Sequence, residues 1–198
     1  SAASDVYKRQ EEDKKSYLER LNQYTDRLSI LITDLFEVSK ASSGNIDLEY
    51  SDINIIEFME QVCAENEELL QAKNLQLVTN LPEKEIHVCL DGNKTYRIFE
   101  NLFTNISKYA LENTRVFLDV KDTGNSVVII MKNTSKEPLD FDSDITERFV
   151  RGDKSRHEAG SGLGLAIVKS FTEVQNGTFM IETDGDPVSY THLTLPTT

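Results

Sequence analysis

Cysteine and histidine are scarce in this sequence, which has 2 Cys and 3 His among 198 residues. Cys63 and Cys89 lie far apart, and neither a Cys-x-x-Cys motif nor a closely spaced histidine pair accompanies them. This pattern argues against a disulfide framework and against a zinc site built from cysteine and histidine. Two unpaired thiols instead favour a reducing compartment, the cytoplasm.

Basic residues and long apolar runs are also in short supply. The sequence has 21 Lys and Arg against 34 Asp and Glu, a formal net charge of -13, which repels nucleic acid and anionic lipid. The longest apolar run, residues 127–131, is far shorter than the ~20 residues that cross a bilayer. We therefore expect no nucleic acid partner and no membrane contact by this fragment, whether or not the full-length protein is membrane-anchored.

The two ends of the chain lack the periodic patterns of folded elements. Residues 1–10 contain no apolar core of a signal peptide, and residues 187–198 form a Thr- and Pro-rich string. We interpret both as translated linker or adapter sequence on a gene fragment. We expect the 187–198 tail to be disordered, and we exclude both ends from the fold.

Residues 11–40 contain neither Gly nor Pro and carry a heptad pattern, with Leu21, Leu28 and Leu35 seven residues apart. Such a pattern predicts a long helix within 11–44 that pairs with another helix or with a second copy of the chain. A helix folded back on its own domain is the alternative.

The remaining residues, 45–186, alternate between strand and helix patterns. They predict an α+β fold, a two-layer sandwich with helices on one side of a mixed sheet. The predicted strands are 46–50, 75–80, 85–90, 114–121, 126–132 and 178–183, and the predicted helices are 55–73, a polar-striped helix after Asp91-Gly92, 145–150 and one that ends near 174.

A glycine-rich loop runs into the last of these helices, with Gly160, Gly162 and Gly164 at alternate positions. Backbone amides without side chains can close around an anion, and the positive end of the following helix points at the same place. The junction suits phosphate groups. The alternative is a flexible loop before a core helix.

The polar-striped helix places Asn101 and Asn105 on one face, four residues apart, with Arg97 before them and Lys108 and Tyr109 one turn later. Amides buried without partners cost free energy, so these two should face something polar. The side-chain oxygen of Asn105 suits Mg²⁺, and Lys108 can sit near the same anion. A solvated helix face is the alternative, and the glycine loop makes it less favoured.

The motifs and their order resemble the catalytic, ATP-binding part of bacterial sensor histidine kinases. Residues 101–109 resemble the family's asparagine box, residues 147–156 its phenylalanine box and residues 160–169 its glycine box, while residues 17–45 resemble the second helix of its dimerisation and phosphotransfer hairpin. The resemblance implies the sandwich fold shared with gyrase and mismatch-repair ATPases. It also implies ATP and Mg²⁺ as cofactors, a homodimer through the N-terminal helix and a response regulator receiver domain as partner.

The resemblance also implies a role for each site residue. Asn105 would be the Mg²⁺ ligand, and Asn101 would stand at the catalytic position. The remaining nucleotide contacts would come from Lys108, Tyr109, Asn133, Arg151, Gly160, Gly162, Leu163, Gly164 and Leu165.

Two positions depart from related patterns. Hydrolases of the superfamily carry a glutamate where this chain has Asn101, and an amide is no general base, which favours transfer to an imidazole over hydrolysis. The family's usual Asp-x-Gly-x-Gly is replaced by residues 133–137, so the acceptor for the adenine amino group is the neutral Asn133. ATP affinity is then modest, or the site is degenerate.

None of His87, His157 and His192 begins a helix as the family's acceptor histidine does. We therefore expect a fragment that binds Mg-ATP but cannot phosphorylate itself. Two other readings stay open. One is a degenerate, non-catalytic dimerisation module of the same fold; the other, a serine kinase or anti-sigma regulator, is disfavoured by the heptad helix.

Overall fold

The computed structural model describes residues 2–44, 46–136, 163–183 and 188–197. The chain divides into two units, Ser1–Phe36 and Glu37–Thr198, and each is described by itself. Among the described residues, no helix combines the length and the apolar character that a membrane crossing requires.

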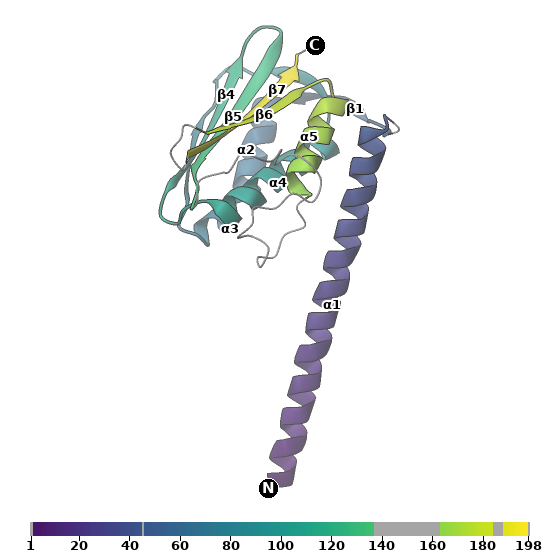
Figure 1. Cartoon of the computed structure of the whole chain (residues 1–198). Helices are drawn as coiled ribbons and strands as arrows, with labels where there is room; N and C mark the ends of the chain where they lie inside the picture. The colour runs from purple at the N-terminus through teal and green to yellow at the C-terminus, as the bar shows by residue number, and fades with distance from the viewer. Residues whose placement is uncertain (1, 45, 137–162, 184–187, 198) are drawn as a thin grey trace. The chain divides into compact units, whose positions relative to one another are not determined.

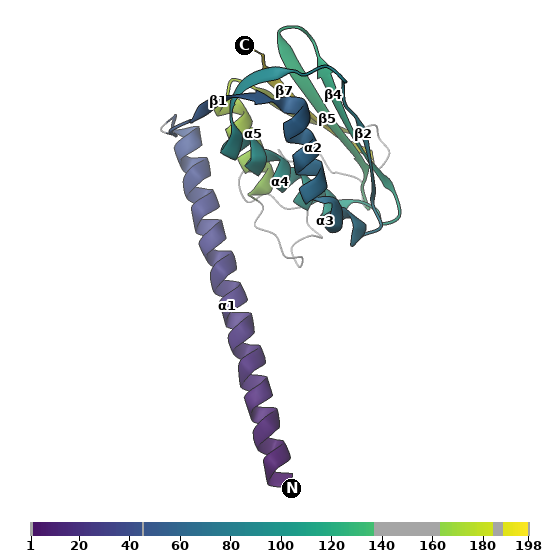
Figure 2. The same ribbon diagram turned by 180° about the vertical axis from the view of Figure 1, so that it is seen from behind.

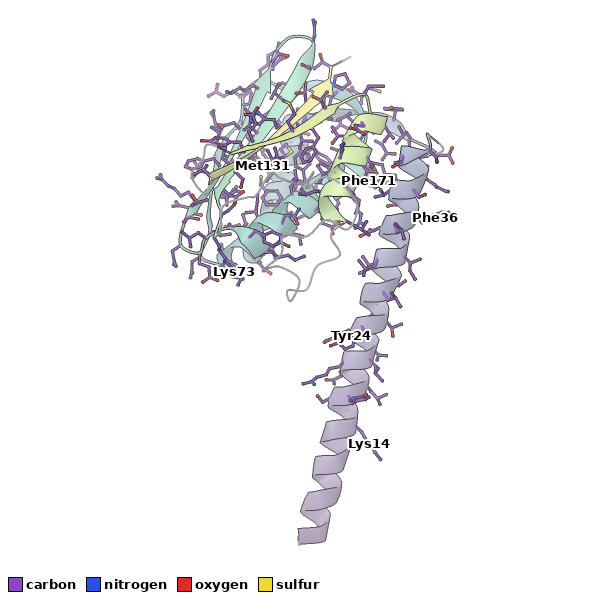
Figure 3. The ribbon with its side chains drawn as sticks, in the orientation of Figure 1. Lys14, Tyr24, Phe36, Lys73, Met131 and Phe171 are labelled. Carbon is purple, nitrogen blue, oxygen red and sulfur yellow. The ribbon has the colours of Figure 1, made fainter. Side chains whose placement is uncertain are left out.

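The first unit is the greater part of one helix, α1 (Ala2–Ser42). The helix predicted for residues 11–40 is confirmed, and it begins earlier in the chain than expected. Its large apolar side chains are exposed, as Tyr24 illustrates in Figure 3. The heptad leucines Leu21, Leu28 and Leu35 are 46%, 58% and 37% exposed, so they remain available to a partner.

The second unit is built on two sheets. A small antiparallel sheet joins β1 (Tyr50–Asn54) to β3 (His87–Asp91). The larger sheet has the order β2-β4-β5-β7-β6, in which β2 runs parallel to β4 and the other neighbours are antiparallel. Its strands are β2 (Gln76–Asn80), β4 (Arg115–Asp122), β5 (Ser126–Thr134), β6 (Thr178–Thr183) and β7 (Val188–Pro196).

Helices cover one face of this mixed sheet (Figures 1 and 2). They are α2 (Ile55–Glu65), α3 (Glu67–Gln71), α4 (Gly92–Tyr109) and α5 (Gly164–Val174). The predicted α+β two-layer sandwich is therefore confirmed.

The core lies between the helices and the sheet because both layers have an apolar side. Val116, Leu118 and Val120 alternate along β4 and are buried, and Met131 of β5 is 1% exposed. These side chains meet fully buried aromatic rings on the helices, including Phe99 and Phe171; Figure 3 labels Phe171 and Met131 in the packed layer. Burying each such side chain stabilises the fold by roughly 1.5–3 kcal/mol, so the core fixes the helices firmly.

Several local predictions need correction. The first strand lies at Tyr50–Asn54 and not at 46–50, because its partner β3 lies far along the chain and fixes its position. The predicted helix 55–73 is interrupted at Asn66. The predicted helix 145–150 lies outside the described residues.

The expectation of a disordered tail is wrong for residues 188–196. They form β7, which pairs with β5 on one side and β6 on the other and buries Leu193 and Leu195. Their period-two burial is what an interior strand requires. The adapter-like origin inferred for both chain ends stays a prediction.

Candidate functional site

Helix α4 is held at its first turn by a buried aspartate. Asp91 is 3% exposed and caps the helix by accepting from Lys94 N at 3.0 Å, while its other oxygen accepts from Glu49 N at 2.9 Å. The backbone N–H of Asp91 donates to Oε1 of Gln175, which follows α5, at 2.8 Å. The start of α4 and the end of α5 are therefore fixed to each other.

The apolar face of α4 packs into the core, and the amide face lies on the other side of the helix. Ile98, Phe99, Leu102, Phe103 and Ile106 are buried, whereas Asn101, Asn105 and Lys108 are only half-buried. This separation follows from the helical period, because the polar residues recur four apart on the side that the apolar residues do not occupy.

The first residue of α5 lies against this amide face. A Cβ added to Gly164 would lie 3.2 Å from Asn101 Oδ1 and 3.5 Å from both Oδ1 and Nδ2 of Asn105. Only glycine allows the backbone to approach the amides this closely without displacing them. The glycine junction therefore lies against the asparagine helix at Gly164.

The amide of Asn101 is oriented by its own helix. Its Nδ2 donates to Arg97 O at 2.8 Å, which leaves Oδ1 as the atom near Gly164. The neighbouring carboxylate of Glu100 accepts from Arg97 Nη1 at 2.9 Å in an ion pair. An amide and a paired carboxylate at these positions do not provide a strong general base for activating water.

Helix α5 begins at Gly164 after Leu163, whose side chain is 1% exposed and cannot accept a hydrogen bond. The first amides of a helix have no acceptor within the helix, and the helix dipole makes this end positive. The first turn of α5, which begins at Gly164, therefore brings the positive end of a helix against the two asparagines.

The other end of α4 is tied to the end of β5. Leu111 N donates to Thr134 O at 2.7 Å, Lys136 N donates to Tyr109 O at 2.9 Å, and the Lys136 ammonium reaches Lys108 O at 3.4 Å. This places the Asn133 segment beside Lys108 and Tyr109. The described site residues therefore lie along one helix, with Gly164 against Asn101 and Asn105 and the end of β5 beside Lys108 and Tyr109.

Three of the predicted site residues, Arg151, Gly160 and Gly162, lie outside the described residues. Within the part of the chain that is described, no three His, Cys, Asp or Glu side chains gather as a metal site. Beside Gly164 the structure places the side-chain oxygens of Asn101 and Asn105, and an amide oxygen is a ligand that suits a hard cation.

The histidines that the structure describes lie on strands. His87 is exposed on β3. The hydrogen bond between its ring and Asp52 raises the pKa of His87, and the negative charge of Asp52 and the contacts with Glu85 raise it by smaller amounts. His192 lies on β7. Neither begins a helix, as expected from the sequence.

Sequence reasoning missed the contacts that anchor the site. For Asp91 a local signal exists, because an aspartate immediately before an amphipathic helix is typical of a helix cap. Gln175, whose side chain accepts from Asp91 N and Thr95 Oγ1, lies far from both in the sequence, so no local pattern indicates it.

Comparison with known proteins gives a consistent result. The model of the family described as "Histidine kinase-, DNA gyrase B-, and HSP90-like ATPase" matches residues 90–198. The sensor protein kinase WalK of Staphylococcus aureus is 32% identical over 174 residues, which cover 84% of this chain and 41% of that relative. The match to WalK of strain NCTC 8325 covers 28% of that relative's length, so the chain spans less than half the length of these curated relatives.

Solved structures share the fold. The Acinetobacter baumannii histidine kinase AdeS superposes with a TM-score of 0.68 at 18% identity, covering 89% of this chain and 81% of that chain. Full-length ShkA in complex with AMPPNP gives a TM-score of 0.79 at 21% identity, covering 92% and 38% of the two chains. The nucleotide-free catalytic domain of histidine kinase ThkA gives a TM-score of 0.66 at 19% identity, and the match covers 75% of this chain and 98% of that chain.

Proposed function

Because the chain belongs to the family of histidine kinase-, DNA gyrase B- and HSP90-like ATPases, we propose that it binds Mg-ATP and passes the γ-phosphoryl group to a protein histidine. The family resemblance predicted from the sequence motifs is confirmed by the family model and the sensor kinase relatives. A degenerate module of the same fold is not favoured. The phosphoryl group would then pass to a response regulator.

The contact between Gly164 and the two asparagines carries this proposal. Asn105 would hold Mg²⁺ through Oδ1, and the N–H groups of residues 162–165 would receive the phosphates. Lys108 would add a positive charge, and Tyr109 would contact the ribose or phosphates. Arg151, Gly160 and Gly162 are assigned by motif alone. The nucleotide of ShkA, AMPPNP, belongs to the same chemical class.

The chemistry around Asn101 supports transfer to an imidazole over hydrolysis. Phosphoryl transfer depends mainly on positioning and on neutralising charge, and Mg²⁺ supplies part of that neutralisation. Asn101 would orient the reacting groups through Oδ1, since its Nδ2 is bonded to Arg97 O. The Glu100 carboxylate is paired with Arg97 and would contribute no base.

The assembly around this site is also part of the proposal. The exposed heptad leucines of α1 favour a homodimer through that helix, in which a histidine on a preceding helix would be the acceptor. The negative net charge and the free cysteines favour a cytoplasmic location for this part of the protein.

Calorimetric titration with Mg-ATP tests the binding step. We expect measurable binding by the wild-type chain, loss of binding in Asn105→Ala, and unchanged binding in Asn125→Ala, which removes an exposed amide from the β4–β5 turn. No heat at millimolar Mg-ATP from a folded wild-type chain contradicts the proposal.

A second measurement tests the transfer step. The chain is incubated with γ-labelled Mg-ATP and a separate polypeptide that contains the histidine-bearing helix hairpin of a sensor kinase. We expect acid-labile label on the hairpin and none on the chain alone. Label on any histidine of the isolated chain, or none on the hairpin, would count against this assignment.

A further inference from the structure

The polar side chains around the end of β5 form a closed ring of hydrogen bonds. Asn133 Nδ2 donates to Ser135 Oγ at 3.5 Å, Ser189 Oγ donates to Asn133 Oδ1 at 3.3 Å, and the two serine hydroxyls lie 3.0 Å apart. Since Ser189 gives its proton to Asn133, the proton between the hydroxyls comes from Ser135. Each of the three side chains therefore donates once and accepts once.

Such a ring can run in either direction. If the amide of Asn133 turns by about 180°, Nδ2 donates to Ser189, Ser189 donates to Ser135, and Ser135 donates to Oδ1. The same number of hydrogen bonds is kept, because a hydroxyl can donate and accept and its proton rotates freely. The surrounding structure therefore does not favour one amide orientation strongly, unlike Asn101, whose Nδ2 is bound to a backbone carbonyl.

The ring is closed on one side and open on the other. Ser135 and Ser189 are buried, at 6% and 8% exposure, whereas Asn133 is half-buried. The amide nitrogen has a second hydrogen and the amide oxygen a second lone pair that the ring does not use. These two point away from each other, so Asn133 can present one of them to a ligand beside the end of α4, to which the strand end is bound through Lys136 and Tyr109.

We propose that Asn133 reads the purine in both amide orientations, so that the site accepts 6-oxopurine nucleoside triphosphates nearly as well as ATP. This inference rests on the proposed function, which places the base at Asn133. Adenine offers a 6-amino donor, which matches the outer lone pair of Oδ1 in one orientation. Hypoxanthine and guanine offer an O6 acceptor at the same place, which matches the outer N–H of Nδ2 after the amide is reversed.

A carboxylate in the same place would discriminate between the two classes. An ionised Asp accepts but cannot donate, so it would pair with the 6-amino group and face O6 with like charge and no proton. A nucleotide that lacks the matching polar group binds much more weakly to such a site, because a buried group of the protein is left unpaired. The variant Asn133→Asp therefore isolates the contribution of the amide.

The experiment compares dissociation constants for Mg-ATP and Mg-ITP, which differ only at the purine 6-position and N1, in wild type, Asn133→Asp and Asn125→Asp. The last variant adds the same charge in the exposed β4–β5 turn. We expect the ITP to ATP ratio to stay within about tenfold in wild type and Asn125→Asp, and to rise at least about tenfold in Asn133→Asp. Mg-GTP then tests whether the 2-amino group is also accommodated.

The outcomes separate this inference from the function on which it rests. The inference is overturned if the wild-type chain binds ATP but binds ITP more than about tenfold more weakly. It is also overturned if the ratio of the ITP and ATP dissociation constants is the same in Asn133→Asp as in wild type. Either result leaves ATP binding intact. Absence of binding by both nucleotides overturns both. If Asn133→Asp does not fold, Asn133→Ala should weaken ATP and ITP by the same factor, and a loss confined to ATP overturns the inference.

Discussion

Gly164 on α5 packs directly on Asn101 of α4: an added Cβ would lie 3.2 Å from Asn101 Oδ1. Such a contact is tighter than most carbon contacts, so a side chain here has to displace the amide. The two residues thus fix the spacing between the helix that carries the asparagines and the helix whose N–H groups face them.

The first prediction follows from this spacing. Gly164→Ala should weaken Mg-ATP binding by about tenfold or more, because a shift of the Asn101 and Asn105 amides misplaces the groups around the nucleotide. Titration calorimetry measures the change. The matched control is Gly92→Ala at the start of α4, where a Cβ would meet only Ile53 Cδ1 at 3.5 Å. Equal affinities in both variants would show that the close contact does not position the amides.

Gly177, between α5 and β6, should tolerate substitution worst of all the glycines described. A Cβ there would lie 2.6 Å from the carbonyl oxygen of Thr194 and 2.8 Å from Thr172 Cγ2. Since a paired strand carbonyl cannot move freely, Gly177→Ala should lower the free energy of unfolding by about 1–3 kcal/mol. Urea denaturation measures this loss, again against Gly92→Ala. A loss below about 0.5 kcal/mol would mean that Thr194 does not pack there.

Much of the fold follows from local pattern. The helical period of α4 separates Phe99 and Phe103 from Asn101 and Asn105, and that separation is what the structure has. Asn54 stands directly before the predicted helix at 55, where an asparagine is a cap signal, and it accepts from Ile56 N at 3.2 Å. Both signals lie within a few residues of the element that they define, so one sequence is enough to read them.

The errors arise where long-range pairing decides. Residues 46–50 alternate like a strand, but the pairing of β1 with β3 selects Tyr50–Asn54, and the Asp91 carboxylate accepts the N–H of Glu49. The alternation of Leu193 and Leu195 in β7 is a strand pattern, but the Thr- and Pro-rich composition around it is typical of disordered segments. The ring at Asn133 needs the register of β5 against β7, which no local pattern contains.

The two cysteines should differ in reactivity. Burial, together with the nearby charge of Glu60, raises the pKa of the Cys63 thiol to about 11, and its residue is 8% exposed. At pH 8 its thiolate fraction is then roughly a hundredfold below that of an ordinary cysteine. Iodoacetamide at pH 8 should modify the more accessible Cys89 first, and Cys63 only after unfolding in urea. Mass spectrometry identifies the site. If iodoacetamide modifies the folded Cys89→Ser variant as fast as the folded wild type, the modified thiol is Cys63, and this would contradict its burial.

The pKa of His87 should be raised by its carboxylate partners. Its Nδ1 lies 3.1 Å from Asp52 and its Nε2 lies 3.6 Å from Glu85 Oε2. The hydrogen bond to Asp52 raises the pKa of His87 above its ordinary value near 6.5, and the negative charge of Asp52 raises the pKa further. Partial desolvation of the imidazole lowers the pKa and so opposes both effects. NMR titration of the imidazole protons should show the raised pKa in wild type, a return toward the ordinary value in Asp52→Asn, and a smaller decrease in Glu85→Gln.

The sign of the accompanying effect on stability is fixed by linkage. Because the folded pKa of His87 is the higher one, the ion pair stabilises β1 against β3 below pH ~6.5, and this contribution is lost as the pH rises through the folded pKa. The stability difference between wild type and Asp52→Asn should therefore shrink as the pH is raised from 5 to 9, measured by urea denaturation. Both side chains are largely exposed, so screening by salt should reduce the difference. A difference that grows with pH would show that Asp52 stabilises β1 by a route other than His87.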